Sequence, residues 1–265
     1  YLSVFPIRLF GVPLSQAALP FLSQYSGAKQ LSKFKDLIIQ SLNQISFLAM
    51  PTSVLLLILR VPIVRLAFGT DKFSWHSTIT TGKILAILAI SITAQAMVQL
   101  LIRSFHALKD TKTPLIISII FTSFYLIGSY FVVNYTDFGI FGLAIISSVS
   151  FMIELLLFMF ILNKLVPNFI GKPLIVPQMK MLLASFFMAI FLYLPFRIFD
   201  ELIFNTTKTI ELIGLTITTG TIGMLVYIYF AAIFEIKELE LVNRAVQTFG
   251  GKWKTNVSKT QEFLV

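Results

Sequence analysis

Long apolar stretches alternate with short polar segments along most of the chain. The apolar stretches are about twenty residues long, and a helix of that length crosses the hydrocarbon of a bilayer. We predict seven such spans, at residues 1–23, 37–59, 84–102, 114–134, 138–163, 181–196 and 212–234. The predicted fold is therefore an all-α integral membrane protein with about seven transmembrane helices.

The segments between the spans indicate how the protein is oriented. If the first span starts outside, one side of the membrane carries Lys29, Lys33, Lys35, Arg103, Lys109, Lys112, Lys164, Lys172, Lys180, Lys237 and the tail. The other side carries Arg60, Arg65, Lys72, Lys83, Arg197 and Lys208. Cytoplasmic loops are enriched in Lys and Arg, so we predict that the first side, with the C-terminus, is cytoplasmic.

Three of these segments are predicted in more detail. Residues 25–40 form either a short amphipathic helix on the cytoplasmic surface or a solvated linker, with Leu31, Phe34, Leu37 and Ile38 on one stripe. Residues 60–83 form an exterior connection, and residues 164–180 form a cytoplasmic one. In the loop after the third span, Thr113 is placed to cap the next helix and Pro114 to start it.

Composition supports a membrane protein and excludes several kinds of site. Hydrophobic residues make up 57% of the chain and charged residues 12%, against about 25% charged in a soluble domain. The chain has no cysteine, which excludes disulfides and thiolate metal sites within it. No phosphate-binding loop, metal-ligand pair or nucleophile motif is found, so we predict no cofactor, no metal and no enzymatic activity. The net charge of +9 indicates membrane orientation and contact with anionic lipid, not nucleic-acid binding.

A few polar residues interrupt the predicted spans. Glu154 lies midway along the fifth span, where a charge costs about 2.5–3.5 kcal/mol on insertion scales. It is either a cavity carboxylate for a cation, a proton or a polar substrate group, or a neutral acid in a structural hydrogen bond. Gln95 and Gln99 share one face of the third span and either line a cavity or join helices. Arg8 lies at an interface or faces a cavity.

Three motifs in order resemble the MurJ/MviN family, the lipid II flippases of the MOP exporter superfamily. The strongest is Arg-Ser-Phe-His-Ala-Leu-Lys-Asp-Thr-Lys-Thr-Pro at 103–114, which contains Arg103, Asp110, Thr111, Thr113 and Pro114. It is similar to the family loop Arg-Ala-Phe-Tyr-Ala-Leu-x-Asp-Thr-x-Thr-Pro. The segments at 10–23 and 59–69 resemble a family helix end and a family turn, and Gly-Ile-Phe-Gly-Leu-Ala at 139–144 resembles a helix start.

The resemblance implies the C-terminal half of a fourteen-helix transporter of the MOP type in the bacterial cytoplasmic membrane. The implied activity is alternating-access translocation of a lipid-linked peptidoglycan precursor. Residues 1–163 would form five spans of the C-terminal lobe, 164–234 two further helices with a groove for the lipid tail, and 235–265 a cytoplasmic tail. Because the chain begins at Tyr1 inside an apolar pattern, we interpret it as a fragment that does not transport alone. Implied partners are the precursor, membrane lipids and cell-wall synthesis proteins.

The candidate substrate contacts are Arg8, Gln16, Gln95, Gln99 and Glu154. The family's functional arginine aligns near Tyr1 rather than Arg8, and the positions of its sodium ligands hold Ile127 and Phe131, so the resemblance supports no sodium site. Two alternatives remain. One is another MOP exporter, for polysaccharide-lipids or for drugs and cations, and the other is a non-transporting membrane scaffold for cell-wall synthesis.

Overall fold

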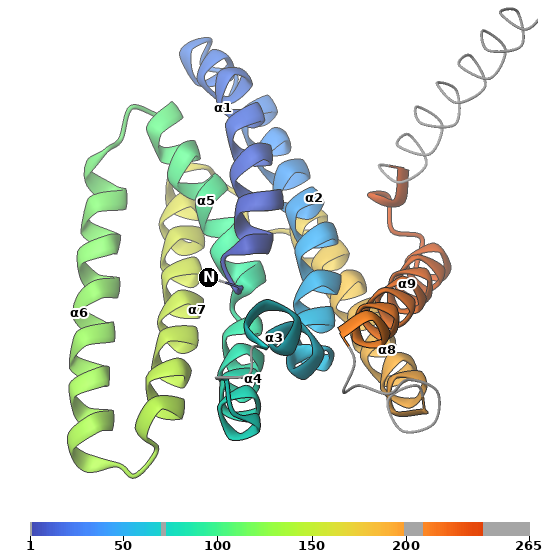
Figure 1. Cartoon of the computed structure of the whole chain (residues 1–265). Helices are drawn as coiled ribbons and strands as arrows, with labels where there is room; N and C mark the ends of the chain where they lie inside the picture. Colours follow the sequence, from blue (N-terminus) through green and yellow to red (C-terminus); the bar gives the residue numbers. More distant parts are fainter. Residues whose placement is uncertain (1, 70–72, 199–208, 241–265) are drawn as a thin grey trace, which may run out of the picture.

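The computed structural model describes residues 2–69, 73–198 and 209–240, and all regular structure within these ranges is helical. The N-terminal part contains a π-helical turn, η1 (Ile7–Gly11), and helices α1 (Val12–Gly27), α2 (Leu31–Ile58), α3 (Arg60–Phe68), α4 (Trp75–Ala89) and α5 (Ile92–Ala107). The C-terminal part contains α6 (Lys112–Tyr135), α7 (Gly139–Leu165), α8 (Lys172–Ile198) and α9 (Thr209–Ile233). Figure 1 shows α6 and α7 as a hairpin on one side, α1, α2 and α5 in the middle, and α8 with α9 on the other side.

Most predicted spans correspond to a membrane-length helix. Helices α2, α6, α7, α8 and α9 are each long and apolar enough to cross a bilayer, and α4 with α5 forms a bent sixth candidate. The first predicted span is a continuous helical run from Phe5 to Gly27, in which η1 leads into α1. The prediction of an all-α membrane protein with about seven spans is confirmed.

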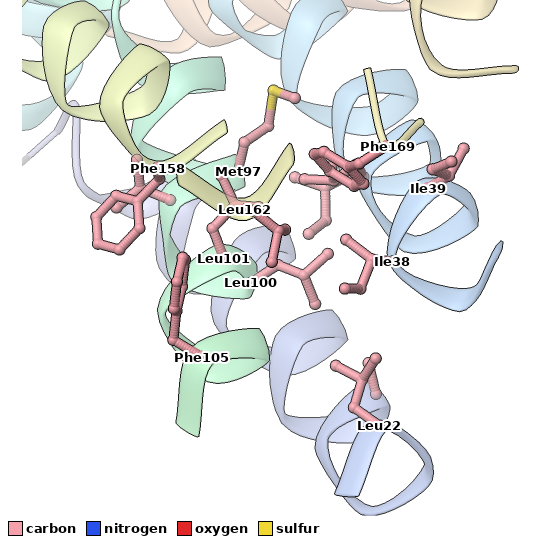
Figure 2. Packing of buried hydrophobic residues seen from close by; sticks show 14 of the residues in the cluster. Leu22, Ile38, Ile39, Met97, Leu100, Leu101, Phe105, Phe158, Leu162 and Phe169 are labelled. Atoms are coloured by element: carbon pink, nitrogen blue, oxygen red, sulfur yellow. The ribbon is translucent and has the colours of Figure 1, made fainter. Parts of the chain in front are cut away.

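Helix α5 lies at the centre of the fold. Figure 2 shows Leu100 and Leu101 of α5 between Ile38 of α2 and Leu162 of α7, and all four side chains are fully buried. Phe105 of α5 packs against Phe158 of α7 with ring centroids 5.7 Å apart. In lipid, helices associate through such packing and through hydrogen bonds, so α5 holds α1, α2 and α7 together.

Close approach of α5 to the N-terminal helix depends on small residues. A Cβ atom added to Gly11 would stand 3.0 Å from Cα of Ala96 in α5, so no larger side chain fits without displacing a helix. Ser15 donates a hydrogen bond from its hydroxyl to the carbonyl of Gly11, one turn earlier. This junction fixes η1 against the first half of α5.

The third span differs from the prediction for residues 84–102. It begins at Trp75 and consists of two helices, α4 and α5, that meet at an angle of 46°. The exterior connection predicted at 60–83 instead contains α3 and the first turns of α4. At the bend, Ser91 Oγ donates to the Leu88 carbonyl at 2.9 Å, and Ser148 Oγ of α7 donates to the Ile87 carbonyl at 2.9 Å. Hydroxyl groups thus satisfy the carbonyls that the bend frees.

Two helices also begin earlier in the sequence than predicted. Residues 31–40 are the first turns of α2 and form no separate surface helix; Phe34 and Ile38 are fully buried in the core, while Leu31 is exposed. Helix α8 starts at Lys172 rather than 181, so the predicted connection at 164–180 shortens to residues 166–171. In both places the helix extends beyond the apolar stretch, because basic side chains at its end reach the interface.

The basic segments gather at one end of the bundle. Figure 1 shows the α1–α2 connection, the α5–α6 loop, the start of α8 and the end of α9 toward the same end. The α6–α7 turn and the α3–α4 region lie at the other end. The predicted tail beyond residue 240 and most of the predicted exterior segment from Arg197 to Lys208 lie outside the described residues.

Candidate functional site

The N-terminal candidates lie on the surface of the bundle. Arg8 is exposed within η1, one turn before Gly11. Gln16 is exposed on α1, whose buried residues Ser15, Ala18 and Leu22 lie on another face. Arg8 therefore lies close in sequence to the Gly11 contact with α5, and Gln16 lies on an exposed face of α1.

Gln95 and Gln99 occupy one half-buried face of α5. Gln95 Nε2 donates a 2.9 Å hydrogen bond to Ser91 Oγ, so its amide helps to close the α4–α5 bend. Gln99 makes no hydrogen bond to another residue that the structure describes. Because Ala96 contacts Gly11, Arg8 and these two glutamines come from neighbouring helices.

Glu154 lies inside the helix packing of α7. Its side chain is only 6% exposed, and it has no hydrogen-bond or ion-pair partner among the residues described. Ser150 and Phe158, one turn before and after it, are buried on the same face. Phe158 contacts Phe105 of α5, and Phe151 contacts Phe121 of α6 at 5.0 Å. Glu154 therefore faces the region where α5, α6 and α7 meet, apart from Arg8 and Gln16.

The 103–114 motif forms the end of α5, a tight loop and the start of α6. Arg103 lies in α5 and not in the loop, and Thr111 stands at the exposed position before α6. Asp110, not Thr113, caps α6. Its Oδ1 accepts from the backbone N–H groups of Lys112 and Thr113 at 3.1 and 3.0 Å, and its Oδ2 accepts from the Thr113 hydroxyl at 2.6 Å. Pro114 is buried as the third residue of α6, where it loses no helical hydrogen bond.

These bonds also stabilise the charged form of Asp110. The hydrogen bond from the Thr113 hydroxyl, followed by the backbone bonds and the nearby Lys112 ammonium, lowers the pKa of Asp110 below its ordinary value of 3.8. The motif therefore has a structural role in this chain, since it fixes the entry of α6 at the basic end of the bundle.

An amide pair between α2 and α8 was not predicted from the sequence. Asn43, only 4% exposed, accepts a 3.0 Å hydrogen bond from Gln178 Nε2 and donates one to the Pro173 carbonyl at 3.4 Å. An amide side chain within an apolar span indicates a polar contact, and this signal could have identified Asn43 as it identified Gln95. Its partner lay in a segment predicted as a connection, so the pair was not foreseen.

Two cavities flank this amide pair. One, which we call the end pocket, has a volume of about 760 Å³ and lies between the first turns of α2 and α8 and residues 235–240; Asn43 lines it. The other, which we call the apolar groove, has a volume of about 730 Å³ and is lined by α2, α4, α5, α7 and α8. Gln178 lines the apolar groove, together with five methionines, Met50, Met97, Met152, Met159 and Met179. None of its described lining residues comes from α9.

Comparison with known proteins agrees with the motif resemblance. The model of the family described as lipid II flippase MurJ matches residues 1–214. The probable lipid II flippase MurJ of Thermotoga maritima is 30% identical over 239 residues, which cover 90% of this chain and 45% of that protein. The corresponding protein of Bdellovibrio bacteriovorus is 26% identical over 242 residues, with 91% and 45% covered.

A solved structure agrees as well. The structure of lipid II flippase MurJ in an inward closed conformation superposes with a TM-score of 0.69 at 27% identity, over 87% of this chain and 44% of that one. The chain thus spans less than half the length of the relatives it matches. Sequence and fold agree over nearly the same region, and the chain belongs to the MurJ family of lipid II flippases.

Proposed function

We propose that the protein translocates a lipid-linked peptidoglycan precursor, lipid II, across the bacterial cytoplasmic membrane, and that this chain supplies one half of the transporter. The observation that carries the proposal is the family match over residues 1–214. The relatives, of which the chain covers about 45%, carry the name lipid II flippase. Translocation would follow alternating access, in which two helical lobes rock about a polar site near the bilayer midplane.

The described helices support a division of roles. Arg8 of η1 and the amides of Gln95 and Gln99 in α5 provide a positive charge and hydrogen-bond donors, which suit the phosphate and sugar groups of the precursor. The apolar groove suits its hydrocarbon tail, because its lining is mostly aliphatic or methionine and methionine adapts its shape to irregular chains. Glu154 would bind a proton, a cation or a polar substrate group within the α5–α6–α7 region. No step in this scheme makes or breaks a covalent bond, so we propose transport without catalysis.

The proposal also covers the orientation of the protein in the membrane and its partners. The basic end of the bundle is cytoplasmic, which places the α5–α6 loop and the C-terminus inside the cell. Residues 1–163 form the lobe, 164–234 provide two further helices, of which α8 lines the apolar groove, and 235–265 form a cytoplasmic tail. Membrane lipids and cell-wall synthesis proteins are the further partners.

Complementation tests this proposal. The gene in full is expressed in bacteria depleted of their own flippase, and growth, membrane abundance of the protein and lipid II on each membrane face are measured. We expect growth and outward movement of lipid II. If the protein is abundant in the membrane but neither is restored, the proposal is wrong, and another exporter of the superfamily or a scaffold becomes the better explanation.

A further inference from the structure

The end pocket has no role in the proposed transport path. It lies at the basic end of the bundle, where α2 and α8 begin and α9 ends, on the other side of α8 from the apolar groove. A helix that crosses the bilayer brings its ends to the level of the lipid headgroups. The volume of about 760 Å³ lies within the range of small-molecule sites. Polar lining residues therefore meet apolar ones, such as Ile39 and Val176, at the depth where a phospholipid changes from headgroup to chain.

Most charges that line the end pocket are not paired with one another. Three lysines and four carboxylates, including Glu240, line the space. The structure places no ion pair among the other six described side chains: Lys172, Lys180, Lys237, Asp36, Glu235 and Glu238. Glu238 Oε2 is fully buried and has no hydrogen-bond partner among the described residues, so this oxygen itself is not open to the space. The arrangement suits a ligand that itself carries both a negative and a positive group.

The lining also selects the kind of positive group. No aromatic side chain is found among the described residues that line the end pocket, although the chain contains 27 phenylalanines. A quaternary ammonium group is usually held by aromatic faces, whereas a primary ammonium group donates hydrogen bonds to carboxylates. For the negative group, the pocket offers lysines and the N-terminal end of α8, where Lys172 is the first residue.

We propose that the end pocket binds the phosphoethanolamine headgroup of a zwitterionic phospholipid. Its lysines contact the phosphate, and its carboxylates accept hydrogen bonds from the ammonium group. The acyl chains follow the apolar surface between α2 and α8 into the bilayer. This site is separate from the path proposed for the transported precursor, and it would hold α8 and the end of α9 against α2.

Lipid retention by the purified protein tests this proposal. The protein in full is incubated in detergent with equal amounts of phosphatidylethanolamine, phosphatidylcholine and phosphatidylglycerol that share the same acyl chains, and retained lipids are counted by native mass spectrometry. We expect several-fold more phosphatidylethanolamine than either other lipid. The double variant Lys172→Gln/Lys180→Gln should lose this excess. Lys164→Gln is the matched control, because Lys164 lies at the same end but outside the pocket, over the Phe160 ring.

A second variant should increase the retention of phosphatidylglycerol, and a misfolded protein would not show such an increase. Asp36→Asn/Glu235→Gln removes two carboxylates and keeps the lysines, so retention should shift from phosphatidylethanolamine to phosphatidylglycerol. Equal retention of the three lipids by the wild type would overturn the proposal. A wild-type preference for phosphatidylglycerol would also overturn it, since that lipid carries no ammonium group. An equal loss in the Lys164→Gln control would show that the effect is general surface charge and not this pocket.

Discussion

Asn43 of α2 and Gln178 of α8 are joined by a 3.0 Å hydrogen bond in which the Gln178 amide donates to the Asn43 side-chain oxygen. The pair forms the boundary between the two cavities, because Asn43 lines the end pocket and Gln178 lines the apolar groove. The Asn43 amide also donates to the Pro173 carbonyl near the start of α8. A polar contact in an otherwise apolar interface thus fixes the register of α8 against α2.

Breaking this pair should destabilise the protein. Asn43→Leu leaves the Gln178 amide without its partner, and we expect a loss of about 1 kcal/mol in the free energy of unfolding, the usual size for hydrogen bonds between membrane helices. The double variant Asn43→Leu/Gln178→Leu should cost less than the sum of the two single variants, because it leaves no orphaned amide. Thermal unfolding in detergent measures all three. Strict additivity would show that the bond does not couple the helices.

The Gly11 junction predicts a steric effect. Gly11→Ala places a Cβ atom 3.0 Å from Cα of Ala96, so η1 and α5 must move apart, at a cost of about 1–3 kcal/mol. Gly27→Ala is the control, because a Cβ atom at that helical position meets nothing within 4 Å, and it should be neutral or stabilising by up to about 1 kcal/mol. The two variants are compared by their membrane abundance and by thermal unfolding. Equal behaviour of the two variants would contradict the close contact.

The spans were predictable because apolar length alone defines them. Hydropathy reports which residues lie at membrane depth, and it does not report where a helix ends. This is why α2 and α8 begin before the predicted spans, among lysines that extend to the interface. The α4–α5 bend was not predictable either. Its cause is a set of hydroxyl bonds, including one from Ser148 of α7, which depends on tertiary contact between distant segments.

Candidate site residues were found by the same criterion, polarity within an apolar span. This criterion selected Gln95, Gln99 and Glu154, and applied evenly it would have selected Asn43 as well. It does not reveal partners: Gln95 turns out to bond Ser91 beside the bend, while Glu154 has no partner among the described residues. The pairing of an intramembrane polar group is a property of the packed helices, not of the segment that carries it.

Asp110 predicts a pH-dependent contribution to stability. Because the bonds from Thr113 and Lys112 lower the pKa of the folded carboxyl group, the contribution is complete well above the ordinary pKa of 3.8. It is lost as the pH falls through the still lower folded pKa. Asp110→Ala should therefore cost about 1 kcal/mol at neutral pH and much less at pH 2, measured by thermal unfolding at both.

An aspartate in the turn at the other end of α6 supplies the control for this cap. Asp137 is an exposed aspartate in the α6–α7 turn, and its side chain makes no hydrogen bond to the described residues. Asp137→Ala should leave stability unchanged at both values of pH. If the two alanine variants lose the same stability, the effect of Asp110 is general charge and not capping of α6.

The predicted orientation can be tested with single cysteines. The chain contains no cysteine, so the introduced residues give a clean signal once any cysteine elsewhere in the protein is replaced. Lys109→Cys marks the α5–α6 loop, and Thr136→Cys marks the α6–α7 turn at the other end. In intact cells, a membrane-impermeant maleimide should label the second variant and not the first, and lysis should expose both. The reverse pattern would place the basic end outside the cell.

Glu154 is the strongest functional prediction, because its environment provides no structural reason for a carboxyl group. A structural acid needs a hydrogen-bond partner, and the described residues offer none. Replacing an unpartnered buried acid by a leucine of similar size removes a desolvation cost. We therefore expect Glu154→Leu to raise thermal stability and keep membrane abundance, while it abolishes rescue of flippase-depleted cells.

Opposite effects on stability and rescue are what distinguish a working carboxyl group from a packing residue. Glu154→Gln adds a graded test: a group that must exchange a proton or hold a cation fails as an amide, whereas a group that only donates a hydrogen bond is partly replaced. Ser150→Ala, one turn earlier on the same face, is the control, since its hydroxyl bonds the Ile146 carbonyl within its own helix. Full rescue by well-expressed Glu154→Leu would show that transport does not use this residue.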